Sequence, residues 1–358
     1  MNRRAYLDWL RGIAVLIMIE AHTIDSWTLV SERERVPFGY AIILGGFGAP
    51  IFLFLAGVAI ALAAGGRLRK GASADGAAAA TRRRGWQIFG LAFLFRLQSW
   101  VLSGGAPLLT LLKVDILNIM GLAMAGAATL WGLARRDLWR AALLACAAAA
   151  LAMLTPIVRA TPWIAALPGP VESYLRPHPG LTTFTLFPWA GFLFAGGALG
   201  VWLDRARAPE AERQIVLALA LGGPAVAIAS YAASFLPPIY AQTNFWTSSP
   251  TFFFLRLGVL LCAVPIAFAL SGAFRLVSEP LEYFGRASFF VYWIHVEMVY
   301  GVLSAAIHKR LTLEQALIAF AIFSAFLFGV AKAKDGIVST WRRGRGRLKP
   351  DGTVVRSP

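Results

Sequence analysis

The chain has 358 residues, of which 58% are hydrophobic and only 15% are charged, and its mean hydropathy is +0.65. Charged residues make up about a quarter of an ordinary soluble domain, so this composition excludes one and indicates a polytopic membrane protein. The formal net charge of +16 comes mainly from Lys and Arg in segments between apolar blocks, which indicates membrane orientation rather than nucleic-acid binding.

About ten apolar blocks are long enough to cross a ~30 Å hydrocarbon layer as helices. In chain order they cover residues 9–28, 41–63, 86–103, 113–133, 138–158, 183–203, 214–236, 251–272, 287–307 and 314–331. The sequence therefore predicts an all-α bundle of about ten transmembrane helices, forming a single domain over residues 1–335. Residues 336–358 are expected to form a basic, disordered cytoplasmic tail near anionic lipid.

Smaller features refine this prediction. The first block is of spanning length and lacks a small-residue cleavage site, so we expect it to be retained as a helix. Residues 65–85 are low in complexity and are expected to form a mobile loop. Gly196 and Gly200 predict close helix packing. Cys146 and Cys262 lie within apolar blocks, so we expect neither a disulfide framework nor a metal site.

The positive residues favour one orientation of the bundle. With the N-terminus in the cytoplasm, the inside segments and ends hold 24 Lys and Arg residues, whereas the outside segments hold six. Such a bias is typical of cytoplasmic segments in membrane proteins. We therefore expect both termini in the cytoplasm and an even number of spans.

The first predicted helix, "LDWLRGIAVLIMIEAHTIDSW", carries five ionisable residues: Asp8, Arg11, Glu20, His22 and Asp25. At ~100° per residue, four of them share a stripe about 100° wide, and only Glu20 lies on the opposite side. Ionisable groups are costly in hydrocarbon, so the stripe must face the bundle interior or a wet cavity.

The spacing within this stripe indicates a chemistry. Arg11 and His22 are separated by ~16 Å along the helix axis, with Arg11 at the cytoplasmic end. Asp25 lies one turn beyond His22, where its carboxylate is expected to orient the imidazole as a general base or acyl carrier. A polar network that merely packs helices is the alternative interpretation of the same residues.

Ionisable residues in later blocks are candidates for binding the substrate that accepts the transferred group. They are Arg96, Lys113, Asp115, Arg256, His295 and Glu297. Arg96 and Arg256 could instead be salt-bridge partners, and Lys113 and Asp115 could mark the membrane edge.

Several motifs resemble those of a known family. "LDWLRGIAVLIMIEAH" resembles the first helix of membrane acyltransferases, in which ten residues separate an arginine from a histidine. The ordered motifs "GAPIFLFLAGVAIAL", "KVDILNIMGLAM", "LFPWAGFLFAGGALG" and "PLEYFGRASFFVYWIH" extend the similarity over most of the chain. Together they resemble the catalytic domain of heparan-α-glucosaminide N-acetyltransferase and its bacterial relatives.

This resemblance implies a membrane acyltransferase that moves an acetyl group from cytoplasmic acetyl-CoA to a sugar or glycan on the outer side. It assigns the arginine–histidine pair to Arg11, which would bind the acyl-CoA, and His22, which would be catalytic, and it adds His295 as a second site candidate. It implies lipid, acyl-CoA and a glycan as partners and the bacterial inner membrane as the location. No metal is implied, and a homo-oligomer is an open expectation.

Two other functions stay open at this point. A proton-coupled secondary transporter or flippase would also use intramembrane Arg, His and carboxylate groups. Many transporters have paired halves with broken helices, and we see no such internal repeat in the sequence. A non-catalytic membrane scaffold is the third possibility, although it gives no reason to keep Arg11 and His22 on one face.

Overall fold

The computed structural model describes residues 4–103, 105–273 and 275–346, and their regular structure is entirely helical. The long helices are α1 (Ala5–Trp27), α3 (Gly48–Arg69), α4 (Ala74–Leu102), α5 (Ile116–Leu133), α6 (Asp137–Ala160), α8 (Leu186–Arg205), α9 (Pro209–Ala233), α10 (Pro250–Ala273), α11 (Arg275–Tyr300) and α12 (Leu313–Gly346). The short ones are η1 (Val30–Glu34), α2 (Val36–Gly45), η2 (Leu108–Leu112), η3 (Pro162–Ala166), α7 (Gly169–Leu175) and η4 (Val302–Ser304).

The all-helical prediction is confirmed, and every predicted span overlaps a long helix. By length and composition, seven stretches of the described helices are apolar enough to cross a membrane: Val36–Arg69, Ile116–Leu133, Asp137–Ala160, Leu186–Arg205, Pro209–Ala233, Pro250–Ala273 and Leu313–Trp341. The chain is therefore an integral membrane protein. The span count of ten and the cytoplasmic placement of the termini stay predictions.

The core lies around α3, α5 and α8, in each of which more than half of the apolar window is buried. The side chains packed there include Phe54, Phe95 and Phe192, each about 1% exposed. α8 packs against α3, where a Cβ on Gly196 would meet the backbone of Phe54, so the predicted close packing at this glycine is confirmed. In contrast, α9 and α12 are mostly exposed, which suits helices that face lipid.

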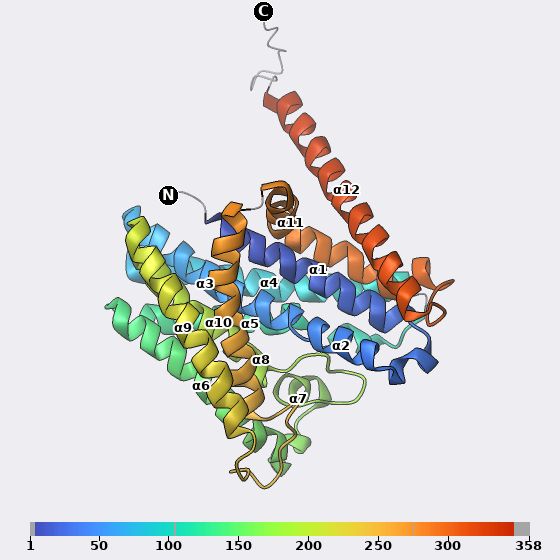
Figure 1. The fold of residues 1–358 in the computed structure, drawn as a ribbon, viewed down its shortest axis with the longest axis horizontal. Helices are drawn as coiled ribbons and strands as arrows, with labels where there is room; N and C mark the ends of the chain where they lie inside the picture. The colour runs from blue at the N-terminus through green and yellow to red at the C-terminus, as the bar shows by residue number, and fades with distance from the viewer. Residues whose placement is uncertain (1–3, 104, 274, 347–358) are drawn as a thin grey trace, which may run out of the picture.

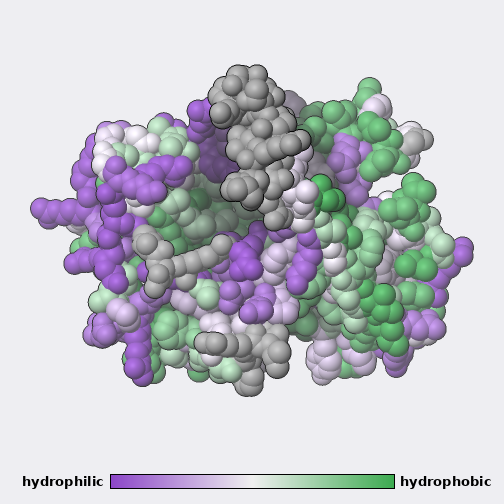
Figure 2. Space-filling model, turned by 90° about the horizontal axis from the view of Figure 1, so that it is seen from above, coloured by the Kyte–Doolittle hydropathy of each residue, from purple (hydrophilic) through white to green (hydrophobic). Residues whose placement is uncertain are grey.

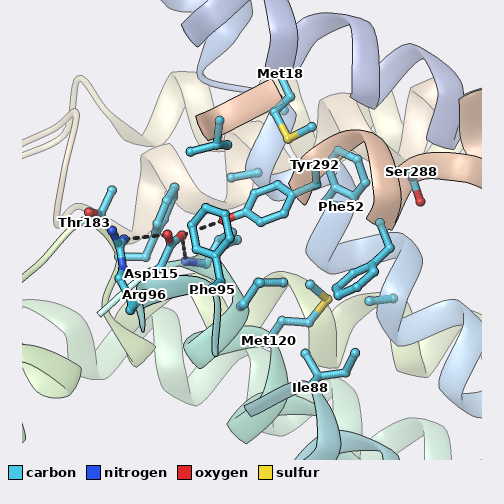
Figure 3. A pocket seen from close by; sticks show the side chains of 18 of the residues that line it. Met18, Phe52, Ile88, Phe95, Arg96, Asp115, Met120, Thr183, Ser288 and Tyr292 are labelled. Carbon is cyan, nitrogen blue, oxygen red and sulfur yellow. Dashed lines mark hydrogen bonds and ion pairs between the residues drawn. The ribbon is translucent and has the colours of Figure 1, made fainter. Parts of the chain in front are cut away.

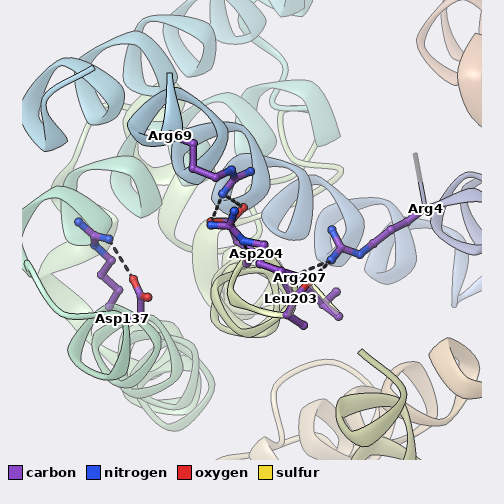
Figure 4. A network of polar contacts seen from close by, with 8 residues as sticks. Arg4, Arg69, Asp137, Leu203, Asp204 and Arg207 are labelled. Carbon is purple, nitrogen blue, oxygen red and sulfur yellow. Dashed lines mark hydrogen bonds and ion pairs between the residues drawn. The ribbon is translucent and has the colours of Figure 1, made fainter. Parts of the chain in front are cut away.

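Polar contacts fix the end of the bundle at which α1 begins (Figure 4). Arg4 donates hydrogen bonds to the backbone oxygens of Leu203 and Ala206 at the C-terminal end of α8, and its guanidinium also pairs with Glu212 of α9 at 2.7 Å. Arg69 pairs with Asp204 at 2.6 Å across α3 and α8. A cation at a helix C-terminus is favourable because the last carbonyls carry partial negative charge.

The opposite end of α1 joins the chain just before α12. The backbone amides of Lys309, Arg310 and Leu311 bond to the carbonyls of Ser26 and Trp27, and Leu29 bonds back to Leu311. Figure 1 shows α12 running from this junction back toward the side where α1 begins. The start of α1 and the end of α12 thus lie on the same side of the bundle.

Two expectations about irregular segments are corrected. Residues 65–85 are mainly helical, because α3 continues to Arg69 and α4 begins at Ala74. The cause is local: Ser73 caps α4 by accepting the amide of Gly76 at 3.0 Å, and the alanine-rich run that follows favours helix. Residues 336–346 continue α12 in place of a disordered tail, since a helix satisfies its own backbone, and residues 347–358 lie outside the described residues.

Candidate functional site

A large cavity runs between the helices. Its volume is about 1570 Å³, above the ~300–1,000 Å³ of most small-molecule sites. Its walls come from α1, α3, α4, α5 and α11 together with the segment from Gly301 to His308. Charged or polar residues of α1, α4 and α11 line it, and these are the three long helices that do not qualify as apolar spans. Charged and polar side chains of these three helices therefore face the cavity inside the bundle.

One end of the cavity is rich in arginine. Arg11 of α1, Arg67 of α3, and Arg83 and Arg84 of α4 line this end, which is the side on which α1 begins. Arg11 also pairs with Asp8 at 3.3 Å. Figure 2 looks onto this side and shows hydrophilic residues around a hollow with apolar walls. The cluster suits a ligand that carries several negative charges.

His22 lies farther along the same cavity and forms a pair with His295 of α11. The Nδ1 atom of His22 and the Nε2 atom of His295 are 2.8 Å apart, and the two rings are within 7° of parallel. His295 is fully buried, whereas His22 is half-buried and lines the cavity. Tyr300 covers His22 edge-on, with a distance of 5.5 Å between ring centroids. The imidazole is thus held on two sides.

The expectation that Asp25 orients His22 is corrected by this geometry. The Asp25 side chain is half exposed and pairs with Arg33 at 3.6 Å, and it accepts a hydrogen bond from the Tyr300 hydroxyl at 3.2 Å. The partner of the imidazole is His295 instead. Helical spacing brought Asp25 within reach, but the carboxylate lies at the end of α1, where Arg33 and solvent stabilise its charge better than the interior would.

Asp115 is the centre of a buried polar cluster (Figure 3). Its carboxylate pairs with Arg96 at 2.6 Å and accepts the hydroxyl of Tyr292 at 3.0 Å. It also caps α5 by accepting the amide of Ile116, while Asn118 bonds back to the backbone of Asp115 at 3.0 Å. Arg96 and Asp115 both line the cavity, so this pair forms a charged section of its wall.

Two further candidates line the cavity with unused polar atoms. The Lys113 ammonium makes no ion pair within the part of the chain that the structure describes. Burial lowers the pKa of Lys113 from its usual value, and the Arg96 guanidinium lowers it further, whereas Asp115 raises it. The Oε1 atom of Glu297 is buried without a hydrogen-bond partner among the described residues. Both groups are available to a ligand.

Arg256 does not line this cavity, so the structure separates it from the other candidates. Its guanidinium lies 4.1 Å from the ring centroid of Phe252 and about 6 Å from those of Phe47 and Trp189. Aromatic faces attract a guanidinium, which explains how this charge is tolerated between helices. The aromatic rings thus stabilise the charge of Arg256, and its predicted role in acceptor binding stays a prediction.

The sequence matches the family described as heparan-alpha-glucosaminide N-acetyltransferase, catalytic, over residues 3–232. The chain belongs to this family. It is therefore a membrane transferase of the acetyltransferase type, and the resemblance inferred from its motifs is confirmed. No curated protein matches the sequence.

The family match includes part of the cavity only. Arg11, His22, Arg96 and Asp115 fall inside the matched residues, whereas α10, α11 and α12 follow them. His295, which contacts the cavity residue His22, therefore comes from a part of the chain beyond the family match. No cluster of three or more His, Cys, Asp or Glu that could hold a metal ion occurs within the described residues.

Sequence reasoning missed two tyrosines of the site. Tyr292 bonds to Asp115 and packs its ring against His295, and Tyr300 covers His22. A helical wheel places Tyr292 one turn before His295, so a common face was detectable. The wheel could not show that this face meets Asp115, because that residue lies 177 positions earlier in the chain.

Proposed function

We propose that the chain transfers an acyl group, commonly acetyl, from acyl-CoA at the arginine-rich end of the cavity to a sugar or glycan that enters from the opposite end. His22 acts as the base or acyl carrier. One observation carries this proposal: a continuous cavity is lined at one end by four arginines and, farther along, by an imidazole held between His295 and Tyr300. Family membership supports acetyl transfer, and it suggests an amino sugar as one acceptor.

The donor end fits acyl-CoA by charge and by size. Guanidinium groups bind phosphate oxygens through paired hydrogen bonds, and CoA carries several phosphates at one end of a long, thin arm. With Arg11, Arg67, Arg83 and Arg84 holding the phosphates, the arm extends along α1 toward His22, ~16 Å farther on. The resemblance implies acetyl-CoA as the specific donor, which reaches this end from the cytoplasm of a bacterial cell.

In direct transfer, His22 removes the proton from an acceptor hydroxyl or amine as that oxygen or nitrogen attacks the thioester carbonyl carbon. The carbon–sulfur bond breaks, and the sulfur leaves and receives the proton from His22, which gives free CoA. In the covalent route, Nε2 of His22 attacks the thioester carbonyl carbon, the carbon–sulfur bond breaks and CoA leaves as the thiolate. The acceptor oxygen or nitrogen then attacks the acyl carbon, the bond between that carbon and His22 breaks, and the acceptor proton passes to the thiolate, which gives free CoA and free His22. Lys113 and Arg96 place positive charge in the wall where an oxyanion forms.

Purified protein in detergent, with radiolabelled acetyl-CoA, tests this proposal. His22→Ala is expected to lower turnover, measured as acetyl-CoA hydrolysis or transfer, by about 10²–10⁴-fold while donor binding is retained. Arg11→Ala is expected to weaken acetyl-CoA binding by about 10–100-fold, because one charge-assisted contact is lost. His178→Ala, in the connection between α7 and α8, is the matched control because His178 does not line the cavity.

Folding of each variant is checked by size-exclusion chromatography and thermal unfolding. Normal turnover in folded His22→Ala would remove the histidine from the mechanism. A folded wild-type protein that neither binds nor turns over acetyl-CoA would contradict the transferase proposal. Uptake of a charged sugar by vesicles that contain such a protein would then favour the proton-coupled transporter.

A further inference from the structure

His295 is buried next to His22, and the function proposed above gives it no task of its own. We propose that His295 is a positioning residue, which fixes His22 in the tautomer whose Nε2 atom is unprotonated and available to the reaction. This inference rests on the proposed role of His22 as base or acyl carrier. It assigns the side of the imidazole that reacts, and it uses a residue beyond the span of the family match.

The backbone of α11 decides which nitrogen of His295 carries hydrogen. The Nδ1 atom of His295 lies 2.9 Å from the carbonyl oxygen of Val291, one turn earlier in the same helix. A carbonyl oxygen only accepts hydrogen bonds, so Nδ1 must be the donor. In a neutral imidazole the other nitrogen is then an acceptor, and Nε2 of His295 presents its lone pair to α1.

His22 faces this lone pair. Its Nδ1 atom is 2.8 Å from Nε2 of His295, so Nδ1 of His22 must carry the hydrogen. The lone pair of neutral His22 is therefore on Nε2, at the edge of the ring turned away from His295. Nε2 of His22 makes no hydrogen bond within the described part of the chain, and His22 is a wall residue of the cavity. A base or nucleophile needs such an available lone pair.

The surroundings of His295 keep it in this role. Its side chain is 0% exposed, and the ring of Tyr292 packs against it with 5.9 Å between centroids. Tyr292 is itself fixed by its hydrogen bond to Asp115. The helices that carry the two histidines are in close contact, since a Cβ on Gly12 would lie 2.0 Å from the carbonyl oxygen of Leu281. The two helices that carry the rings are thus packed backbone to backbone near the start of α1.

A second neutral imidazole is a suitable partner in this place. A carboxylate would also orient His22, but burying its charge inside the membrane costs several kcal/mol unless it is paired. His295 supplies the same directed acceptor without a net charge. This explains why the imidazole bonds to His295 rather than to the exposed Asp25 at the end of α1.

Two substitutions at position 295 separate positioning from packing. His295→Gln places an amide oxygen near the position of Nε2, where it accepts the Nδ1 hydrogen of His22, whereas His295→Leu fills the space without an acceptor. We expect His295→Leu to lower kcat by about 10²-fold or more and to leave the KM for acetyl-CoA unchanged. His295→Gln should stay within about tenfold of the wild-type kcat. His178→Gln and His178→Leu are the matched controls.

The tautomer is measured directly by nitrogen NMR of full-length protein labelled at its histidines. The chain has four histidines, so single substitutions assign the signals. We expect a protonated Nδ1 and a bare Nε2 at His22, and a loss of that single tautomer in His295→Leu. A protonated Nε2 at His22 in the wild type would overturn the proposal, as would equal kcat values for the Gln and Leu variants when both are folded.

The His22→Ala variant is assayed in parallel, which separates two kinds of failure. If His22→Ala keeps normal turnover while NMR of the wild-type protein shows the expected tautomer of His22, the proposed function fails and the hydrogen-bond geometry stands. If His22→Ala loses turnover while His22 of the wild-type protein has the opposite tautomer, the proposed function stands and the role of His295 fails.

Discussion

At the scale of single residues, Asp115 connects three parts of the molecule. It caps α5, pairs with Arg96 of α4 and accepts the hydroxyl of Tyr292 of α11. Arg96 and Asp115 are both largely buried, with side-chain exposures of 16% and 10%. Removing one partner of such a pair leaves an uncompensated charge, which is more damaging than removing both.

Asp115→Asn isolates the charge of this residue. Asparagine is as good an N-cap as aspartate and keeps an oxygen for Tyr292, so only the ion pair with Arg96 is lost. We expect a loss of about 3–5 kcal/mol in the free energy of unfolding in detergent. The double variant Arg96→Leu with Asp115→Asn should lose less than the sum of the single changes.

The exposed pair of Arg135 and Asp75 is the matched control. Its side chains are 63% and 75% exposed, so Asp75→Asn should change stability very little. Equal effects of Asp75→Asn and Asp115→Asn would show that burial of the Arg96–Asp115 pair has no energetic importance.

The sequence predicted well which residues face the interior of the bundle. It predicted less well which of those residues contact one another. Helical periodicity placed Arg11 and His22 on one stripe, and both line the cavity. The same periodicity suggested Asp25 as the partner of His22, because it ranks neighbours only along one helix. His295 is 273 positions away, and a contact between two helices depends on how they cross, which a single-helix pattern does not contain.

At the scale of helices, the contact between α1 and α11 depends on the absence of side chains. A Cβ on Gly285 of α11 would lie 2.0 Å from the carbonyl oxygen of Asp8. Small residues let helix backbones approach closely inside a membrane, where apolar burial between helices adds little. Farther along, the same two helices carry His22 and His295, whose ring nitrogens are 2.8 Å apart.

Gly285→Ala should therefore disturb the site from a distance. The added methyl group meets backbone, which cannot move aside locally, so α1 and α11 must separate at a cost of about 1–3 kcal/mol. We expect lower thermal stability and reduced turnover. Gly90→Ala in α4 is the control, because a Cβ there meets nothing within 4 Å. Unchanged stability and turnover in Gly285→Ala would contradict this account of the α1–α11 contact.

The helices themselves were largely predictable, and their limits were not. Apolar blocks identified the places of the ten long helices found in the described residues, since burial in lipid requires long apolar runs. The helical residues beyond these apolar blocks were missed: α4 begins at Ala74 and α12 continues to Gly346. Hydropathy ends at the edge of the hydrocarbon layer, whereas a helix continues wherever capping and propensity favour it.

At the scale of the whole molecule, the polar helices are gathered around one cavity. α1, α4 and α11 carry charged side chains that lipid would not tolerate, and each supplies residues to the cavity wall. α6, α9, α10 and α12 are more exposed and strongly apolar. The arrangement explains how a protein with 15% charged residues keeps a chain of ionisable groups inside a membrane.

The proposed function requires that the arginine-rich end of the cavity faces the cytoplasm, where acyl-CoA is found. This orientation can be measured with single cysteines in a background with Cys146→Ala and Cys262→Ala. Ala72→Cys lies in the exposed turn between α3 and α4, beside the arginine-rich end, and Thr243→Cys lies in the exposed connection between α9 and α10. The two positions are expected on opposite sides of the membrane.

A maleimide that cannot cross membranes should label Thr243→Cys from outside the membrane that holds the protein, and should label Ala72→Cys only after that membrane is permeabilised. The bias of 24 positive residues against six predicts this result, because positive segments are retained in the cytoplasm. The reverse pattern would place Arg11, Arg67, Arg83 and Arg84 outside the cell. Acyl-CoA could not then reach them, and the donor would have to be an anionic compound available on the outer side.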